Sequence, residues 1–252
     1  EEGRFPFFRT LHSLAFRELG MQRDEVMTDS HYRKFGKAMG IEFRGIYDEN
    51  IGLHTGDGLG DKCSRIESLA RVGLRTIDQQ MSITNVNDLN SHAVKQYNNS
   101  LISYKKEQGL YDFTDMLEKY NSQLPVDVCI FDEAQDLSSA QYKMAILAAS
   151  LAGEVYIAGD DDQAIFGWAG ADVHKFLNLK GQKTTLPNSH RIPRKVHALA
   201  NDVASRIKNR YPKKWAPKKE EGEVHYVTNE QDIDFSITGT WMLLDNKALH
   251  TQ

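Results

Sequence analysis

The sequence predicts an α/β fold in which a mostly parallel sheet is covered by helices and interrupted by a mainly helical domain. Two short apolar strands are expected at residues 126–131 and 154–158, and each runs into a cluster of acidic residues. A helical pattern at 138–151 separates them, and strand–helix–strand order is typical of parallel strands. Residues 21–109 are polar and carry helical patterns, which predicts an insertion.

The composition is that of an ordinary globular chain. Of 252 residues, 40% are hydrophobic and 26% charged, enough to bury a core. The apolar runs are far shorter than the roughly 20 residues that a membrane helix needs, so no membrane partner is expected. Cys63 and Cys129 are far apart, which argues against a disulfide framework or zinc site; Cys129 lies in an apolar strand and is expected in the core. The net charge of −4 does not exclude nucleic-acid binding, because a local patch can bind phosphates.

The remaining elements are expected in the following order. The segment 8–19 is expected to be helical, with Thr10 as a suitable N-cap. The insertion has helical patterns at 30–39, 63–72 and 88–106, with a loop marked by Gly52, Gly56, Gly58 and Gly60. A short helix at 113–120 precedes the first strand. After the second strand, we expect strands at 183–186, 224–227 and 241–244 and a helix at 193–208.

The first acidic cluster is Asp132-Glu133-Ala134-Gln135-Asp136. The carboxyl end of a parallel strand is where α/β proteins bind ligands. Asp132 could hold Mg²⁺ against nucleotide phosphates, and Glu133 could orient or deprotonate a water that attacks phosphorus. The alternative is that these acids only cap the helix that begins near Ser138.

The second cluster follows Gly159 and contains Asp160, Asp161 and Asp162. Gln163, just beyond it, could sense a terminal phosphate by hydrogen bonding. Phe166 and Trp168 are suited to stacking on bases, which contributes roughly 1–3 kcal/mol per base. The alternative is that both rings belong to the core.

In order and spacing, these motifs resemble those of the UvrD/Rep-type superfamily 1 DNA helicases. The resemblance implies a RecA-like, P-loop NTPase-type sheet. Residues 1–20 and 110–182 would form the first motor domain, 21–109 the inserted domain, and 183–252 the start of a second RecA-like domain. Five segments carry the resemblance: Thr10-Leu11-His12-Ser13-Leu14-Ala15, Asp112-Phe113-Thr114-Asp115-Met116, Asp132–Asp136, Gly159–Asp172 and Leu186-Pro187-Asn188-Ser189-His190-Arg191.

The resemblance also implies an ATP-dependent helicase or translocase that moves 3′→5′ on single-stranded DNA or at single/double-strand junctions. Such a protein would work in the cytoplasm, or with DNA in the nucleoid or nucleus; no oligomeric state follows. The cofactors would be ATP and Mg²⁺, with Asp132 and Glu133 at the metal. Glu133, Gln163 and Arg191 would be catalytic, the last two on the γ-phosphate, and His190 would lie on the nucleotide. The residues on DNA would be Thr10, His12, Phe113, Phe166 and Trp168.

The sequence departs from the family pattern in several places. His190 replaces an adenine-stacking Tyr, Ser189 an Asn, and Phe166 a Tyr; Ala169 stands where the family often has a DNA-contacting Arg. The Gly-x-x-x-x-Gly-Lys-Ser/Thr loop is absent from these 252 residues. We therefore expect a piece of a longer protein that alone has little ATPase activity. The alternative is a degenerate module that binds single-stranded DNA or a partner without hydrolysing ATP.

Overall fold

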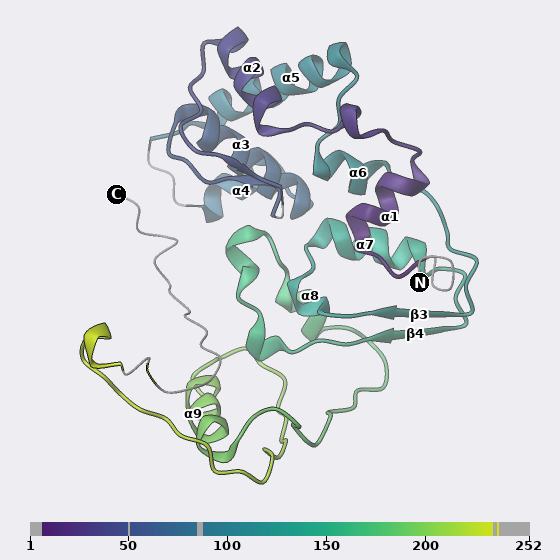
Figure 1. The fold of residues 1–252 in the computed structure, drawn as a ribbon. Coiled ribbons are helices and arrows are strands. Elements are labelled where there is room, and N and C mark those ends of the chain that lie inside the picture. Colours follow the sequence, from purple (N-terminus) through teal and green to yellow (C-terminus); the bar gives the residue numbers. More distant parts are fainter. Residues whose placement is uncertain (1–6, 50, 85–87, 234–235, 237–252) are drawn as a thin grey trace. The chain divides into compact units, whose positions relative to one another are not determined.

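The chain divides into two units, Glu1–Gly181 and Gln182–Gln252. Figure 1 shows the fold in a computed structural model, which describes residues 7–49, 51–84, 88–233 and 236. The first unit holds both acidic clusters and the expected insertion. In the described part of the chain, none of the helices has the length and apolarity that crossing a bilayer requires.

A short parallel sheet carries the two acidic clusters. Strands β3 (Val128–Phe131) and β4 (Glu154–Ile157) pair in parallel, with Val128 opposite Glu154 and Phe131 opposite Ile157. Helix α7 (Ser139–Ala148) connects them, and the predicted strand–helix–strand unit is confirmed. Because the strands are parallel and in register, both end at the same edge of the sheet, which is where the acidic residues begin.

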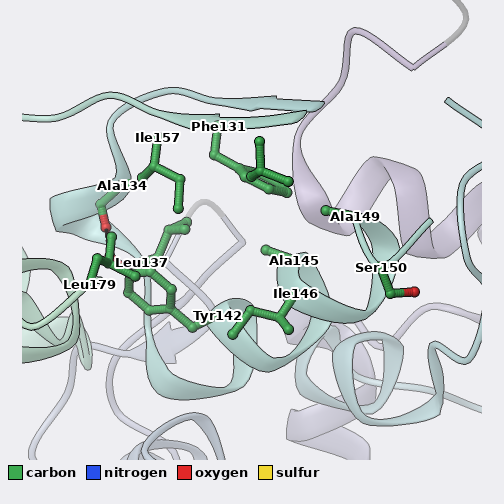
Figure 2. A pocket seen from close by; sticks show the side chains of 11 residues that line it. Phe131, Ala134, Leu137, Tyr142, Ala145, Ile146, Ala149, Ser150, Ile157 and Leu179 are labelled. Atoms are coloured by element: carbon green, nitrogen blue, oxygen red, sulfur yellow. Dashed lines mark hydrogen bonds between the residues drawn. The ribbon is translucent and has the colours of Figure 1, made fainter. Parts of the chain in front are cut away.

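The sheet is less covered than the sequence suggests. The strands face α7 across an apolar hollow of about 290 Å³, lined by Phe131, Val155 and Ile157 from the strands and by Tyr142 and Ala145 from the helix (Figure 2). Ile130 is 69% exposed and Tyr156 56% exposed. The expectation that Cys129 lies in the core is wrong: its side chain is only half-buried, because the described sheet has two strands and an incomplete cover.

The segments on either side of the expected insertion form one core. Helix α1 (Leu11–Glu18) has Thr10 as its N-cap, as predicted. Helix α6 (Phe113–Lys119) packs against α1 and α7. The core that they share joins residues before position 22 to residues after position 115: Leu14, Ala15, Met21, Met116, Leu117, Tyr120, Leu124, Ala140, Met144 and Ala148.

The segment from Met27 to Leu110 has a separate core and is mainly helical. Its helices are α2 (Asp29–Met39), α3 (Leu59–Val72), α4 (Ile77–Ile83) and α5 (Ser91–Gln108), grouped together in Figure 1. Its buried residues lie between Met27 and Leu110. The domain boundaries at 20/21 and 109/110 remain predictions; the cores separate close to them, with Met21 in the first core and Leu110 in the second.

The predicted glycine-rich loop is shorter than expected. Helix α3 begins at Leu59, so Gly58 is its N-cap and Gly60 lies inside the helix. An antiparallel hairpin, β1 (Tyr47–Asp48) and β2 (Leu53–His54), precedes the loop and was not predicted. The loop is tight: a Cβ on Gly45 would lie 2.1 Å from the backbone nitrogen of Gly56, so neither position has room for a side chain.

Short turns complete the first unit. Helix α8 (Val173–Leu177) follows the second acidic cluster, and single 3₁₀ turns are formed by η1 (Arg23–Glu25), η2 (Ala134–Asp136), η3 (Asp161–Gln163) and η4 (Phe166–Ala169). Three of these turns lie in the two predicted motifs. The motifs are therefore built on short turns anchored at strand ends, which places their side chains at the sheet edge.

The second unit contains helix α9 (Arg194–Ala204) and the turn η5 (Glu230–Asp232). The strands predicted at 183–186 and 224–227 are wrong, since neither segment pairs in a ladder with another described residue. Among the residues of this unit that the structure describes, an isolated bridge joins Asn188 and Ala216. The strand predicted at 241–244 lies outside the described residues.

Candidate functional site

Asp132 and Glu133 stand exposed where β3 ends. The Asp132 carboxylate accepts a hydrogen bond from the backbone N–H of Glu133 (2.9 Å). Glu133 has φ 51° and ψ 39°, a left-handed conformation that is uncommon for a residue with a side chain. This backbone turn ends the strand abruptly, and such strain is often found at functional sites.

The helix-capping alternative for these acids is wrong. Helix α7 is capped by Ser138, whose hydroxyl accepts from the backbone N–H of Gln141 at 3.2 Å. The Gln141 side chain in turn accepts from the N–H of Ser138 at 2.7 Å, which completes a capping box. Asp132 and Glu133 are therefore not needed for the helix and are available for a ligand.

The buried side chain of Gln135 connects the first acidic loop to the second. Its amide nitrogen donates to a Glu133 carboxylate oxygen (2.7 Å) and to Asp136 (3.2 Å). Its amide oxygen accepts from the backbone N–H of Asp160 (3.0 Å). The sequence places Gln135 within the first motif but does not indicate its role, which depends on the position of the second loop.

Gly159 is required by this connection. A Cβ at position 159 would lie 2.5 Å from the amide oxygen of Gln135 and 3.0 Å from the Phe176 ring, so a side chain there would displace the Gln135 amide. The next residues form the turn η3, in which the Gln163 amide donates to a carboxylate oxygen of Asp160 at 2.6 Å. The structure therefore brings Glu133, Asp160 and Gln163 to one edge of the sheet.

The carboxylates fit a magnesium ion that is shared with a nucleotide. Among the described residues, no ion pair engages Asp132 or Glu133, and no group of three or more His, Cys, Asp or Glu is arranged as a closed metal site. Mg²⁺ usually binds one or two carboxylates together with water and phosphate oxygens, so an open pair suits it better than a cage.

His12 and Phe113, both predicted to contact DNA, lie together. Their rings meet edge to face with centroids 5.5 Å apart. Both line a small hollow of about 50 Å³, together with Gly52 of the hairpin and Ala169 of η4. Burial lowers the pKa of His12 to about 4, so its imidazole is neutral near pH 7 and can meet a phosphate only by hydrogen bonding. Thr10 is exposed, and its hydroxyl accepts from the N–H of Ser13 at 3.2 Å.

Phe166 and Trp168 are surface residues, so the alternative that both are core is wrong. Phe166 is 39% exposed and Trp168 is 55% exposed. Their turn is held firmly: Gly170 has φ +100°, and a Cβ there would lie 2.8 Å from Val72 of α3. Two residues further along, Asp172 accepts from the Ser139 hydroxyl at 2.8 Å. Two partly exposed aromatic rings thus lie on a turn whose following residues contact α3 and α7.

His190 and Arg191 belong to the second unit, where both are exposed. The Ser189 hydroxyl accepts from the backbone N–H groups of Arg191 (3.3 Å) and Ile192 (3.1 Å), which fixes the turn. Ser189 therefore has a local role that an Asn could also fill. That Arg191 and His190 reach the nucleotide remains a prediction.

A buried cluster of charges includes Asp112, the residue before Phe113, and was not predicted from the sequence. Asp112, the N-cap of α6, accepts from Arg71 (2.9 Å) and Lys105 (2.5 Å), which come from helices of the insertion. The same two cations contact Asp115 at 2.7 Å each. The cluster fixes α6, which carries Phe113, to the insertion. Its sequence signal was weak, because the partners are 7 to 44 residues apart.

The charges in this cluster perturb one another. Burial alone would raise the pKa of Asp112, but the charges of Arg71 and Lys105 outweigh it and hold that pKa well below its usual value. Burial raises the pKa of Glu67 to about 7, against the pull of Arg71 and with a contribution from the Asp112 charge. Asp112 therefore remains ionised at neutral pH, whereas burial favours the neutral form of Glu67.

The chain matches the family model described as UvrD/REP helicase N-terminal domain over residues 7–184. It is 28% identical over 163 residues to the ATP-dependent DNA helicase Rep of Buchnera aphidicola, covering 56% of this chain and 24% of that protein. It is 28% identical over 144 residues to the ATP-dependent DNA helicase PcrA of Leuconostoc citreum (54% and 19%). It is 33% identical over 110 residues to DNA helicase II of Haemophilus influenzae (41% and 15%). The chain thus spans a quarter or less of each of these relatives.

Proposed function

Because this chain belongs to the UvrD/REP helicase family, we propose that it is part of an ATP-dependent DNA helicase or translocase. The observation that carries the proposal is the meeting of the two acidic loops at one sheet edge, joined through Gln135. The segment that continues from the second loop carries Phe166 and Trp168, both exposed. Gln163, the proposed phosphate sensor, and the two proposed base-stacking rings are therefore parts of one short stretch of chain.

The nucleotide chemistry follows from the edge residues. Asp132, with Glu133 beside it, would hold Mg²⁺, which when bound neutralises charge on the phosphates. The Glu133 carboxylate would accept a proton from the attacking water. Gln163 would hydrogen-bond the γ-phosphate, and Arg191 would neutralise charge that develops on it, with His190 against the base.

The domain division supports this chemistry. We assign residues 1–20 and 110–182 to a first RecA-like domain, 21–109 to an inserted domain and 183–252 to the start of a second RecA-like domain. The two separate cores and the unit boundary after Gly181 support these limits. In a motor of this kind, ATP binds between the two RecA-like domains, and their closure moves the DNA.

The DNA would follow the surface that carries the aromatic residues. Phe166 and Trp168 would stack on bases of single-stranded DNA, including the strand at a single/double-strand junction, and so would Phe113, which lines a hollow with Ala169 of the same turn. Thr10 and His12 would contact the backbone by hydrogen bonds. The family resemblance, rather than any residue here, supports 3′→5′ movement. Such a protein works where DNA is, in the cytoplasm, nucleoid or nucleus.

Single-strand binding tests this proposal directly. Trp168→Ala should raise the Kd for a fluorescent oligothymidylate about 5- to 150-fold, the equivalent of roughly 1–3 kcal/mol for one lost base stack. Fluorescence anisotropy at fixed salt measures it, since salt alone changes such affinities strongly.

Tyr156→Ala is the matched control. Tyr156 is an aromatic residue of β4 and is 56% exposed, almost the same as Trp168 at 55%, but it lies outside the proposed DNA surface. Its replacement should leave the Kd unchanged. Equal Kd values for wild type and folded Trp168→Ala would remove Trp168 from the DNA site.

A further inference from the structure

The Gln135 side chain is committed to both acidic loops at once. It is 1% exposed, and its amide supplies two donors and one acceptor to three separate groups. The donors meet the carboxylates of Glu133 and Asp136, while the acceptor meets the backbone N–H of Asp160, 25 residues further along the chain. A buried amide with all three contacts made is held in one orientation.

An amide suits this position better than other side chains of its size. Two carboxylates lie on its nitrogen side, so a carboxylate at position 135 would add a third negative charge and lose both donors. Its oxygen accepts a hydrogen bond from the backbone N–H of Asp160, and a leucine at position 135 would leave that N–H without this acceptor. The missing room for a Cβ at Gly159 shows how closely the second loop approaches the amide oxygen.

We propose that Gln135 is a positioning residue that holds the Glu133 carboxylate and the Gln163 turn in one rigid frame. The frame runs from Glu133 through the amide to the Asp160 backbone, and from the Asp160 carboxylate to the Gln163 side chain (2.6 Å). A displacement of Gln163 by a γ-phosphate would therefore be transmitted to Glu133. This inference rests on the proposed function, because it assigns Glu133 to water activation and Gln163 to phosphate sensing.

The frame can be tested on this chain by the exchange rate of the Asp160 backbone amide, measured by NMR and corrected for intrinsic exchange. In Gln135→Leu the Asp160 amide should exchange about tenfold faster or more, because its acceptor is gone. Gln123→Leu is the control: Gln123 is an exposed glutamine whose amide donates to the Ser150 hydroxyl; Gln123 precedes β3 and Ser150 precedes β4, whereas the acidic loops follow these strands. It should leave the exchange of Asp160 unchanged.

Gln135→Glu supplies a readout that a merely structural role would not move. A carboxyl group between Glu133 and Asp136 is easier to protonate than an ordinary one, and its protonated form can again donate to one carboxylate. The disturbance of Glu133 caused by Gln135→Glu should therefore diminish as the pH falls, and kcat should recover. Wild type and Gln135→Leu should show no such recovery of kcat. The variant has the size of wild type, so it carries the test even where Gln135→Leu does not fold.

ATP hydrolysis by the whole protein completes the test. Gln135→Leu should lower kcat about 10²-fold with KM changed less than about threefold, because a misplaced catalytic group costs rate rather than binding. Gln135→Glu should regain kcat toward lower pH. Wild-type kcat in folded Gln135→Leu, with Glu133→Gln inactive, would overturn this inference alone. A whole protein without ATPase activity would overturn the proposed function, and with it the catalytic role of the frame, even with the exchange result intact.

Discussion

Replacing Lys105 with Met should destabilise the first unit far more than replacing another lysine of the same helix. Lys105 lies in α5 with its side chain 7% exposed, and its ammonium contacts Asp112 (2.5 Å) and Asp115 (2.7 Å). Methionine keeps the length of the apolar stem and removes the charge. The two carboxylates, 5% and 14% exposed, would then share Arg71 as their nearby cation among the described residues.

The size of the effect follows from burial. Removing one partner of a buried ion pair costs about 3–5 kcal/mol, because the remaining charge is left in a poorly solvated place. Arg71 stays in contact with both carboxylates, so we expect the lower end, about 3 kcal/mol. Lys95→Met is the matched control. Lys95 also lies in α5 and contacts Asp78 at 2.7 Å, but the two side chains are 49% and 60% exposed, which predicts a loss of about 0–1 kcal/mol.

Urea unfolding of the three proteins, followed by far-UV circular dichroism, gives these free energies from the transition midpoints. Most of the described helices belong to the first unit, so the signal reports mainly its unfolding. A Lys105→Met protein whose free energy of unfolding lies within about 1 kcal/mol of the Lys95→Met protein would refute the claim that this charge cluster joins α6 to the insertion.

Three further outcomes are expected. First, the His12 pKa of about 4 lies below the value of about 6.5 in an unfolded chain, so stability is complete above pH 6.5 and is lost as the pH falls toward 4. Urea unfolding at pH 7 and at pH 4.5 measures how much free energy of unfolding is lost between them, and this loss should be up to about 3 kcal/mol smaller in His12→Gln. The same loss in both proteins would contradict the lowered pKa of His12. Second, Gly159→Ala should lower stability by about 1–3 kcal/mol and speed exchange of the Asp160 amide, since its Cβ would meet Gln135; a neutral substitution would argue against the close approach. Third, this chain alone should show little ATPase activity, and robust Mg²⁺-dependent, DNA-stimulated turnover would contradict that.

The sequence predicted the elements whose signals are local. The strands at 128–131 and 154–157 are short apolar runs that end in acids, and α1 and α7 begin at a Thr and a Ser that cap them. The seven-residue helix α4 and the β1–β2 hairpin, whose strands have two residues each, were missed. Such elements are stabilised by tertiary contacts, for example the Asp29 carboxylate that accepts from the N–H of Tyr47 at 3.0 Å.

The wrong predictions also have physical causes. A strand requires a hydrogen-bonding partner, and residues 183–186 and 224–227 have strand-like composition but no ladder among the described residues. Cys129 lies in an apolar strand, yet burial depends on what covers the sheet.

At the candidate site, the motif residues were identified from the sequence, while their organisation was not. The sequence places Gln135 next to Asp136, but its contact with Asp160 depends on the register between two strands. Likewise, the exposure of Phe166 and Trp168 could not be decided from a pattern that suits both core and surface. What remained hidden are contacts between segments far apart in the chain.

The measurement that tests the central claim most directly is DNA-stimulated ATP hydrolysis by the whole protein carrying Glu133→Gln. A glutamine keeps the size and hydrogen-bonding oxygen of Glu133 and cannot accept the proton of the attacking water, so kcat should fall about 10²- to 10⁴-fold while ATP binding is retained. Glu154→Gln, at the opposite end of the same two strands, should turn over as wild type. A Glu133→Gln protein with wild-type kcat would contradict the assignment of this sheet edge as the water-activating site.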